Sequence, residues 1–346
     1  MRGRAAVFDG ATVLVIDDDE QIRRLISQLL RPMGLRLEEA ASAEEAEEKL
    51  KAAPPDLVLL DMQLPGRSGH EVLEDIRANP GTRLVPVVMI TGAATSERKL
   101  RAIEAGVTDF IAKPFSPQEL AARVRALLEL KFATDALEDA ERVIVALART
   151  IDARDRYTYG HSARVSLYAG LLGERVGLEG QALETVRRGG LFHDFGKIAV
   201  RDAVLLKPAK LTAAEYEEIK EHPREGRDLL QNMKTLAHAM GVVYHHHERM
   251  DGSGYPDGLA GEAIPITARV TTIADVFDAL TTARVYRGAL SREDTLGIMA
   301  AEVGKGWWDG RLLEEFRGVL DTLPEDDKRI ARASEGLSSS RPSLQR

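Results

Sequence analysis

The chain contains no cysteine, and this absence removes several classes of protein from consideration. Disulfide scaffolds, thiolate zinc sites, iron–sulfur clusters and cysteine nucleophiles are all excluded. Glycine and proline are modest, at 29 and 14 of 346 residues, so this is not a low-complexity chain. No apolar run approaches the roughly 20 residues that span a bilayer, and the N-terminus lacks the apolar core of a signal peptide. We therefore expect a cytoplasmic protein that makes no membrane contact.

The chain also lacks an excess of basic residues. Lysine and arginine number 47 against 55 aspartates and glutamates, which gives a net charge of −8. This is the wrong sign for a protein that coats nucleic acid. Hydrophobic residues make up 44% and charged residues 29%, so the chain can fold as a globular protein, and 346 residues suggest two domains.

Short apolar runs alternate with amphipathic stretches over the first third of the chain. These runs are apolar on both faces, which is typical of strands buried in a parallel sheet. They cover residues 13–16, 35–40 (a weaker run), 57–60, 87–90 and 110–112. Five strands that alternate with helices predict an α/β fold of the doubly wound, flavodoxin-like class.

Polar residues follow these strands at the point where each strand ends. They are Asp17, Asp18 and Asp19 after the first strand, Asp61 after the third, Thr91 after the fourth and Lys113 after the fifth. Active sites of such sheets lie beyond the carboxyl ends of the strands, and Mg²⁺ would join carboxylates that otherwise repel each other. A single aspartate after a strand can also be a helix N-cap, but that reading does not explain the residues at the other three strand ends. Asp19 itself is expected to face solvent or to cap the first helix.

Residues 12–127 resemble the receiver domain of two-component response regulators. The resemblance rests on the stretches VLVIDDDEQIRRLI, LVLLDMQLPGRSG, VVMITG and DFIAKPF. It implies that Asp61 accepts a phosphoryl group from a cognate histidine kinase. The implied Mg²⁺ ligands are Asp17, Asp18 and the main-chain carbonyl of Gln63. The residues implied to respond to the phosphoryl group are Thr91, Phe110 and Lys113.

One long helical pattern continues over residues 116–150, well past the end of a receiver domain. Two interpretations stay open: a continuous helix that carries a signal as a rigid strut or pairs with its twin in a homodimer, or an ordinary helix that caps a domain. We expect a first domain over 10–128, a connector over 129–150 and a second domain over 151–325. The Ser-rich tail over 331–346 is expected to be disordered.

Beyond residue 150 the pattern changes to amphipathic helices without clear strands, and seven of the eight histidines lie there. Without cysteine, histidine and carboxylate are the remaining ligands for a transition metal. His193 and Asp194 are adjacent, so they could serve one site from one helix, with Asp194 bridging two metals. An isolated His-Asp pair is often only structural, but Lys197 adds a cation that suits phosphate one turn later. Asp275 lies on an apolar helix, where an uncompensated carboxylate is costly.

Residues 140–322 resemble the HD-GYP family, which belongs to the HD superfamily of metal-dependent phosphohydrolases. The matching stretches are RDRYTYGHSARV, LFHDFGKIAV, LLKPAKLT, IKEHPREG, HHERMDGSGYPDGLAGEAIP and IADVFDALTTARVYR. The resemblance implies an all-α domain that hydrolyses cyclic di-GMP to pGpG and, in many members, to GMP. The implied metal ligands are His161, His193, Asp194, His222, His246, His247 and Asp275. The implied substrate contacts are Lys197, Arg284 and Arg287, beside a pocket shaped by Gly254, Tyr255 and Pro256.

The same resemblance implies a centre of two divalent transition metals, iron or manganese. Some members carry a glutamate one turn before the first histidine, which supports a third metal; Tyr157 stands there in this chain, so we expect two. Two metals lower the pKa of a bridging water from 15.7 towards about 7, and the resulting hydroxide attacks phosphorus. Asp251 or a metal-bound water would then protonate the leaving oxygen.

The leading hypothesis is a phosphorylation-regulated cyclic di-GMP phosphodiesterase. One alternative is a signalling adaptor whose HD-GYP domain mainly contacts other proteins, such as diguanylate cyclases. Another keeps the chemistry and changes the substrate to a different cyclic dinucleotide. Direct DNA binding is not expected, because no helix-turn-helix or basic output domain is left unassigned.

Overall fold

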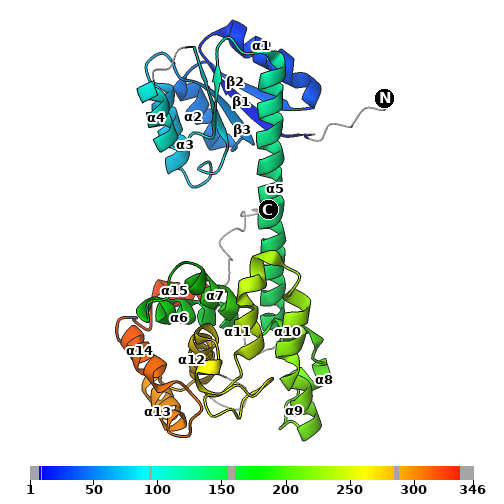
Figure 1. The fold of residues 1–346 in the computed structure, drawn as a ribbon, viewed down its shortest axis with the longest axis vertical. Coiled ribbons are helices and arrows are strands. Elements are labelled where there is room, and N and C mark those ends of the chain that lie inside the picture. Colours follow the sequence, from blue (N-terminus) through cyan, green and yellow to red (C-terminus); the bar gives the residue numbers. More distant parts are fainter. Residues whose placement is uncertain (1–7, 9, 93–95, 155–159, 284–287, 336–346) are drawn as a thin grey trace, which may run out of the picture. The chain divides into compact units, whose positions relative to one another are not determined.

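The chain divides into two compact units, Met1–Ala140 and Glu141–Arg346. The computed structural model describes residues 8, 10–92, 96–154, 160–283 and 288–335, and its ribbon is drawn in Figure 1. Within these residues, no helix combines the length and the apolar character that crossing a membrane requires.

The first unit is a five-stranded parallel sheet with helices on both faces (Figure 1). The strand order is β2-β1-β3-β4-β5, so the predicted doubly wound fold is confirmed. The strands are β1 (Thr12–Ile16), β2 (Arg36–Ala40), β3 (Leu57–Asp61), β4 (Val87–Thr91) and β5 (Asp109–Ala112). The helices are α1 (Glu20–Leu30), η1 (Arg31–Met33), α2 (Ala43–Ala52), α3 (Gly69–Ala78) and α4 (Ser96–Glu104).

Side chains of the central strands alternate between two apolar cores. In β1, Val13 and Val15 enter the core that is shared with α1 and the start of α5. Leu14 and Ile16 point the other way, into the core that is shared with α2, α3 and α4. Because both faces are covered, the central strands β1, β3 and β4 are buried and almost wholly apolar. The polar residues that end or follow the strands meet at one edge of the sheet.

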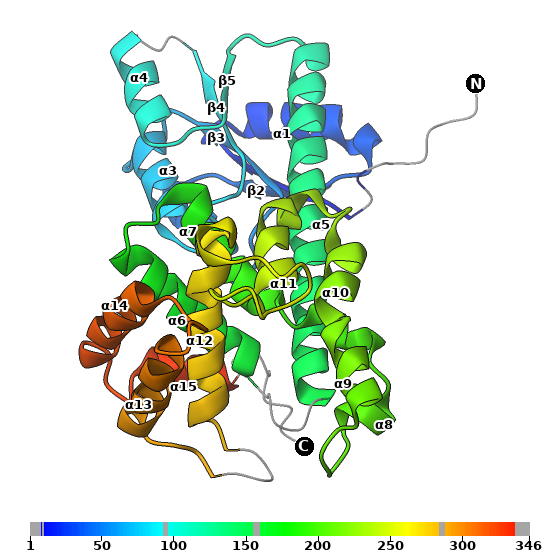
Figure 2. The ribbon, with the colours of Figure 1, turned by 60° about the horizontal axis from the view of Figure 1, so that its bottom comes forward.

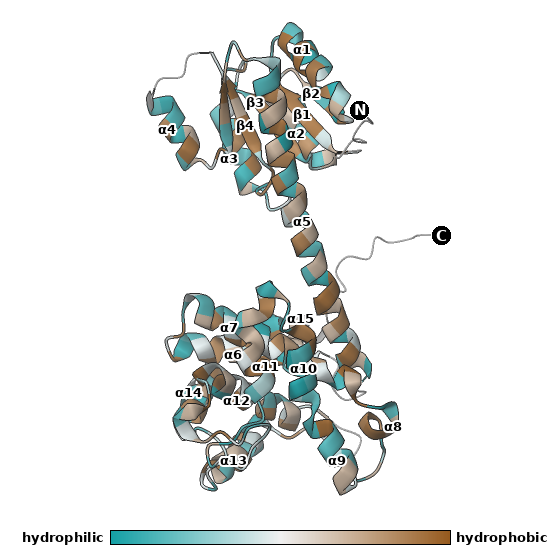
Figure 3. Ribbon diagram, turned by 45° about the vertical axis from the view of Figure 1, so that its right-hand side comes forward, coloured by the Kyte–Doolittle hydropathy of each residue, from teal (hydrophilic) through white to brown (hydrophobic). Residues whose placement is uncertain are grey.

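Helix α5 runs without interruption from Pro117 to Arg154, over 38 residues. The predicted long helix over 116–150 is therefore confirmed, and it extends one turn further. Its first turns pack into the sheet core through Leu120 and Val124, and its last turns pack into a core of the second unit. Figure 3 shows hydrophobic and hydrophilic residues alternating along it. A helix that belongs to the cores of both units is more than a cap on one of them.

The second unit is helical, as predicted, and the isolated bridge between Asp251 and Ala260 is the β-pairing in its described residues. Helix α12 contacts α6, α7 and α11, an arrangement visible in Figure 2. The longer helices are α6 (His161–Arg175), α7 (Gly180–Phe192), α9 (Ala213–Lys220), α10 (His222–Leu230), α12 (Ile266–Thr281), α13 (Arg292–Val303), α14 (Gly310–Asp321) and α15 (Lys328–Glu335). The shorter ones are η2 (Phe195–Ala199), α8 (Asp202–Leu205), η3 (Lys234–Ala239), α11 (Met240–His245) and η4 (Gly261–Ala263).

The expected disorder from residue 331 is wrong for its first five residues, which continue helix α15. The Asp327 carboxylate accepts a hydrogen bond of 2.7 Å from the Arg329 amide and so caps the start of this helix. Ile330 packs against the core that α6, α12 and α14 share. Residues 336–346 lie outside the described part of the chain.

Candidate phosphoacceptor site and metal centre

Lys113 joins the two buried carboxylates at the carboxyl edge of the sheet. Its Nζ lies 2.7 Å from Asp17 Oδ2 and 2.9 Å from Asp61 Oδ2. Burial lowers the pKa of Lys113, but the hydrogen bonds to both carboxylates outweigh it and raise that pKa. Burial raises the pKa of Asp17, and the neighbouring Asp61 adds to this rise while Lys113 opposes it. Asp17, Asp61 and the exposed Asp18 form a group that could hold a metal ion.

The other predicted receiver residues surround this group. Thr91 ends β4, is buried, and donates from Oγ1 to Met62 Sδ at 3.8 Å. The backbone amide of Gln63 donates to Asp61 Oδ1 at 3.4 Å. Phe110 in β5 is partly buried against the core of α2, α3 and α4. The Asp19 carboxylate accepts from the Gln21 amide, so its predicted role as cap of α1 is confirmed.

In the second unit the structure brings all seven predicted metal ligands together. They are His161 at the start of α6, His193 and Asp194 between α7 and η2, His222 at the start of α10, His246 and His247 after α11, and Asp275 in α12. The expectation that His193 and Asp194 share one helix needs correction. Helix α7 ends at Phe192, and Asp194 is the N-cap of the separate 3-10 turn η2.

Asp194 belongs to two overlapping groups of potential ligands. One group is His161, His193 and Asp194, and the other is Asp194, His222, His246 and His247. Within each group the ligand atoms lie within 4.8 Å of one another. Asp275 Oδ1 joins the first group, at 3.1 Å from His161 Nε2. A carboxylate shared in this way is suited to bridging two cations.

The spacing of ring nitrogens in the second group fits a common cation. His222 Nε2 and His246 Nε2 lie 3.1 Å apart. Two nitrogens at roughly 2.1 Å from one metal ion, at right angles, would be about 3 Å apart. Burial lowers the pKa of His222 to about 4 and that of His247 to about 3, so these rings are neutral and can act as ligands.

Three of the histidines are oriented by backbone carbonyls three residues earlier in the chain. The Nδ1 atoms of His193, His222 and His246 lie 2.9, 2.7 and 3.0 Å from the carbonyl oxygens of Gly190, Ile219 and Val243. Each Nδ1 therefore carries its proton, and each Nε2 is directed into the cluster. Among the described residues, buried His193 Nε2 has no hydrogen-bond partner. It faces two carboxylates, with Asp194 Oδ2 at 3.3 Å and Asp275 Oδ1 at 3.7 Å. A buried ring nitrogen directed at two carboxylates suits a shared cation, so these residues fit a metal centre.

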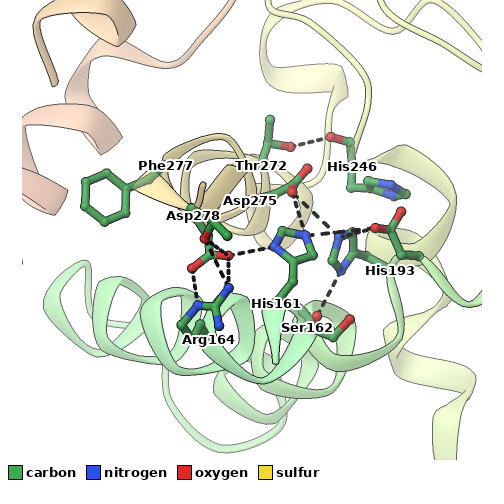
Figure 4. Close-up of polar contacts among 12 residues, drawn as sticks. His161, Ser162, Arg164, His193, His246, Thr272, Asp275, Phe277 and Asp278 are labelled. Atoms are coloured by element: carbon green, nitrogen blue, oxygen red, sulfur yellow. Dashed lines mark hydrogen bonds and ion pairs between the residues drawn. The ribbon is translucent and has the colours of Figure 1, made fainter. Parts of the chain in front are cut away.

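His161 is oriented differently, by a carboxylate (Figure 4). Its Nδ1 lies 2.8 Å from Asp278 Oδ2, and Arg164 donates to both oxygens of Asp278 at 2.7 and 2.9 Å. Burial alone lowers the pKa of His161, but its hydrogen bonds to Asp275 and Asp278 raise it to about 10, so a cation bound at Nε2 would have to displace a proton. A carboxylate behind a ligating histidine fixes its tautomer and increases its basicity.

The loop after His247 is held by Glu248, which is 2% exposed. Its two carboxylate oxygens accept from the amides of Asp257 and Leu259, at 2.8 and 3.0 Å. A Cβ at Gly254 would lie 2.4 Å from the Glu248 Cα, so only glycine permits this close approach. The Tyr255 ring then lies 4.8 Å from the His247 ring, at the edge of the cluster.

Gly196 has a comparable role in η2. A Cβ at this position would lie 1.8 Å from the backbone oxygen of His222. The turn that carries Asp194 can therefore lie directly against the start of α10. This backbone contact brings ligands from two distant segments into one cluster.

The remaining predicted residues differ in how they relate to the cluster. Lys197 Nζ lies 2.7 Å from Asp194 Oδ2, at its edge. Asp251 is exposed, and its hydrogen bonds with Ser253 lower its pKa. A carboxyl group with a lowered pKa is already deprotonated at neutral pH and has no proton to give, so this geometry does not favour Asp251 as the acid. The Pro256 carbonyl faces Arg224, at 3.4 Å. Three residues with predicted roles, Tyr157, Arg284 and Arg287, lie outside the described residues.

Comparisons with known proteins agree with this geometry. The chain matches the response regulator receiver domain over residues 13–125 and the HD domain over residues 145–312. It is 36% identical over 319 residues to the cyclic di-GMP phosphodiesterase response regulator RpfG of Xanthomonas campestris. The aligned region covers 86% of this chain and 84% of RpfG. The chain is an HD-GYP response regulator.

Two further relatives come from Vibrio cholerae. A probable cyclic di-GMP phosphodiesterase is 33% identical over 323 residues, covering 83% of this HD-GYP response regulator and 73% of that protein. The 3'3'-cGAMP-specific phosphodiesterase 1 is 36% identical over 178 residues, covering 51% and 41% respectively.

Sequence reasoning missed two residues of this HD-GYP response regulator that orient others. Asp278 lies one helical turn after Asp275, so a second carboxylate on an apolar helix was an available signal. Glu248 follows the histidine pair directly, and its burial was not visible in the sequence. Neither residue belongs to either group of potential metal ligands.

Proposed function

We propose that this protein is a phosphorylation-regulated response regulator that hydrolyses cyclic di-GMP to pGpG, and further to GMP, at a binuclear metal centre. The observation that carries the proposal is the pair of overlapping ligand groups that share Asp194. His161, His193 and Asp275 would hold one ion with Asp194. The other three histidines, His222, His246 and His247, would hold the second. Iron or manganese is proposed for both ions, because histidine-rich sites with carboxylates suit either metal.

When bound, the two cations supply Lewis-acid activation of water and neutralise charge on the phosphodiester. The protein's own residues bind and orient the substrate. Lys197 holds an ammonium group beside Asp194, where it would contact a phosphate oxygen. Burial raises the pKa of Tyr255, so its hydroxyl stays protonated and can donate to a phosphate or a ribose. Arg284 and Arg287 are proposed as further phosphate contacts.

The deciding experiment measures turnover of cyclic di-GMP by protein loaded anaerobically with Mn²⁺ or Fe²⁺. We expect about two metals per chain by elemental analysis and turnover that His193→Ala abolishes. His238→Ala is the matched control, because His238 lies on η3 and belongs to neither ligand group. Less than one metal per chain with full activity would rule out the binuclear mechanism.

A second substrate has one observation in its favour, the similarity to a 3'3'-cGAMP-specific phosphodiesterase. The same assay with 3'3'-cGAMP compares kcat/KM for the two dinucleotides. Preference for cyclic di-GMP supports the main proposal, and preference for cGAMP replaces the substrate without changing the chemistry. Absence of turnover with both, at full metal content, favours the adaptor alternative with partners such as diguanylate cyclases.

In the receiver domain, Mg²⁺ is proposed to bind Asp17, Asp18 and the Gln63 carbonyl, and Asp61 is proposed to accept the phosphoryl group. The two carboxylates that already share Lys113 support this assignment. The donor would be a histidine kinase in the cytoplasm, where we also place this protein. We propose that phosphorylation activates hydrolysis.

A homodimer is part of the same proposal. Several apolar side chains of α5 are exposed, among them Leu130 and Leu137 at 63% each and Leu147 at 43%. Leu130 and Leu137 are seven residues apart, as are Ala140 and Leu147. Ala140 follows Leu137 by three residues, so the two pairs occupy the two apolar positions of a heptad repeat. Such a stripe is complementary to a second copy of itself in a parallel pair of helices. Sedimentation analysis with a Leu137→Glu variant tests the assembly.

A further inference from the structure

We infer that the last turn of α5 is a positioning element of the metal centre, acting through Asp152 and Arg154. The two residues hold the two backbone segments that supply His161 and Asp194. This inference rests on the proposed function for its catalytic consequence, and on contacts within the second unit for everything else.

Asp152 holds the start of helix α6. Its carboxylate is 4% exposed and accepts from the Ser162 amide at 3.1 Å and from Ser162 Oγ at 2.7 Å. Ser162 is the residue after His161, and His161 is the first residue of α6. The backbone amide at a helix start has no partner within the helix, so Asp152 supplies one. Any displacement of Asp152 is therefore passed directly to the residue next to a metal ligand.

Arg154 holds the opposite segment, the turn η2 and its exit. Its guanidinium donates to the carbonyls of Lys197, Ile198 and Val200, at 3.3, 3.2 and 2.7 Å, and to Asp202 Oδ1 at 2.7 Å. This turn begins directly after Asp194 and carries Lys197, whose ammonium reaches back to Asp194. The Arg154 side chain thus fixes the position of the backbone that follows Asp194, the proposed bridging ligand.

The two residues reach different segments because they lie two positions apart on a helix, where side chains point roughly 200° away from each other. The preceding turn of α5 contributes Ile151 and Ala148 to an apolar core. That core also contains Phe192 and Phe195, the residues that flank His193 and Asp194 in sequence. Helix α5 is therefore hydrogen-bonded to or packed against the three segments that carry His161, His193 and Asp194. The same helix begins at Pro117, four residues after Lys113 of the receiver site. A change in the receiver that moves α5 would act on the metal centre at this turn.

The first test measures metal binding and needs no substrate. Outer partners of metal ligands typically cost 10–100-fold in metal affinity or activity when removed. We expect Asp152→Asn and Ser162→Ala to release metal to a chelator 10–100-fold faster than the wild-type holoprotein. The double variant should release metal no faster than the faster-releasing single variant, because both changes act on the hydrogen bond between Asp152 and Ser162 Oγ. Additive effects would show that Asp152 does not act through the Ser162 hydroxyl.

The matched control is Glu141→Gln, also on α5. Glu141 pairs with Arg188 of α7 at 2.8 Å, eleven residues before Asp152 on the same helix. We expect it to keep the wild-type rate of metal release. If Glu141→Gln and Asp152→Asn release metal equally fast, Asp152 has only a general structural role and the inference is wrong. Thermal unfolding of each apoprotein identifies a variant that fails to fold, and Ser162→Ala then carries the test alone.

The second test separates positioning from substrate binding. For Asp152→Asn and for Arg154→Lys, kcat should fall while KM for cyclic di-GMP stays within a factor of two, since neither residue reaches the substrate. The ratio of turnover with and without beryllofluoride should also fall towards one. A wild-type ratio in both variants would overturn the coupling. If the wild type hydrolyses no cyclic dinucleotide, the proposed function fails, and metal release still decides the positioning role.

Discussion

Replacement of Asp278 by asparagine tests how the ligand His161 is supported. Asp278 is 1% exposed and accepts four hydrogen bonds, one from His161, two from Arg164 and a longer one of 3.4 Å from Thr282 Oγ1. Asparagine keeps the volume but removes the negative charge that faces two cationic or polar donors. Hydrogen bonds to charged groups contribute about 1.5–3 kcal/mol each, and losing one partner of a buried ion pair costs about 3–5 kcal/mol. We expect the free energy of unfolding of the apoprotein to fall by about 3–5 kcal/mol.

The same variant should weaken the metal centre. Asparagine can still accept from His161 Nδ1, so the tautomer is kept but the ring becomes less basic. We expect metal to bind about 10-fold more weakly in Asp278→Asn and nearer 100-fold more weakly in Asp278→Ala. The measurements are urea unfolding after chelation and the rate of metal transfer to a coloured chelator.

Asp309→Asn provides the control for the loss of an ion pair. Asp309 pairs with Arg269 at 2.7 Å, at side-chain exposures of 15% and 16%, and lies outside both groups of ligands. Asparagine also preserves its role as cap of α14. We expect a loss of about 1 kcal/mol and unchanged metal release. If Asp278→Asn behaves like this control in both assays, the support of His161 by Asp278 is refuted.

Three further changes test other parts of the argument. Lys197→Ala should keep both metals and lose kcat, because its ammonium contacts Asp194 without being a ligand; loss of metal would disprove that role. Asp61→Asn should remove the response to beryllofluoride, which is expected to change turnover by about 5- to 150-fold in the wild type, and a persisting response would mean that the signal enters elsewhere. Gly196→Ala should destabilise the fold by about 1–3 kcal/mol or more, because its Cβ would lie 1.8 Å from a backbone oxygen of α10; wild-type urea unfolding would contradict this.

The sequence alone predicted the elements, because their signals are local. Apolar runs such as Val87–Ile90 have to be strands that are covered on both sides. The helical spacing past residue 116 predicted a long helix to residue 150, one turn short of its observed end at Arg154. The orientation of His193, His222 and His246 is equally local, since each ring is held by a carbonyl three residues earlier. The order of motifs was also sufficient to identify the family.

The tertiary structure decided which side chains support the ligands. Asp278 meets His161 across 117 residues, and Arg154 meets the carbonyls of η2 across more than 40. No periodicity within one segment encodes such pairs, because they depend on how α5, α6 and α12 pack against one another. The burial that isolates Asp152 and Glu248 from water arises only in that packing. The sequence therefore determined the chemistry available to the site, and the packing of the helices determined which groups orient that chemistry.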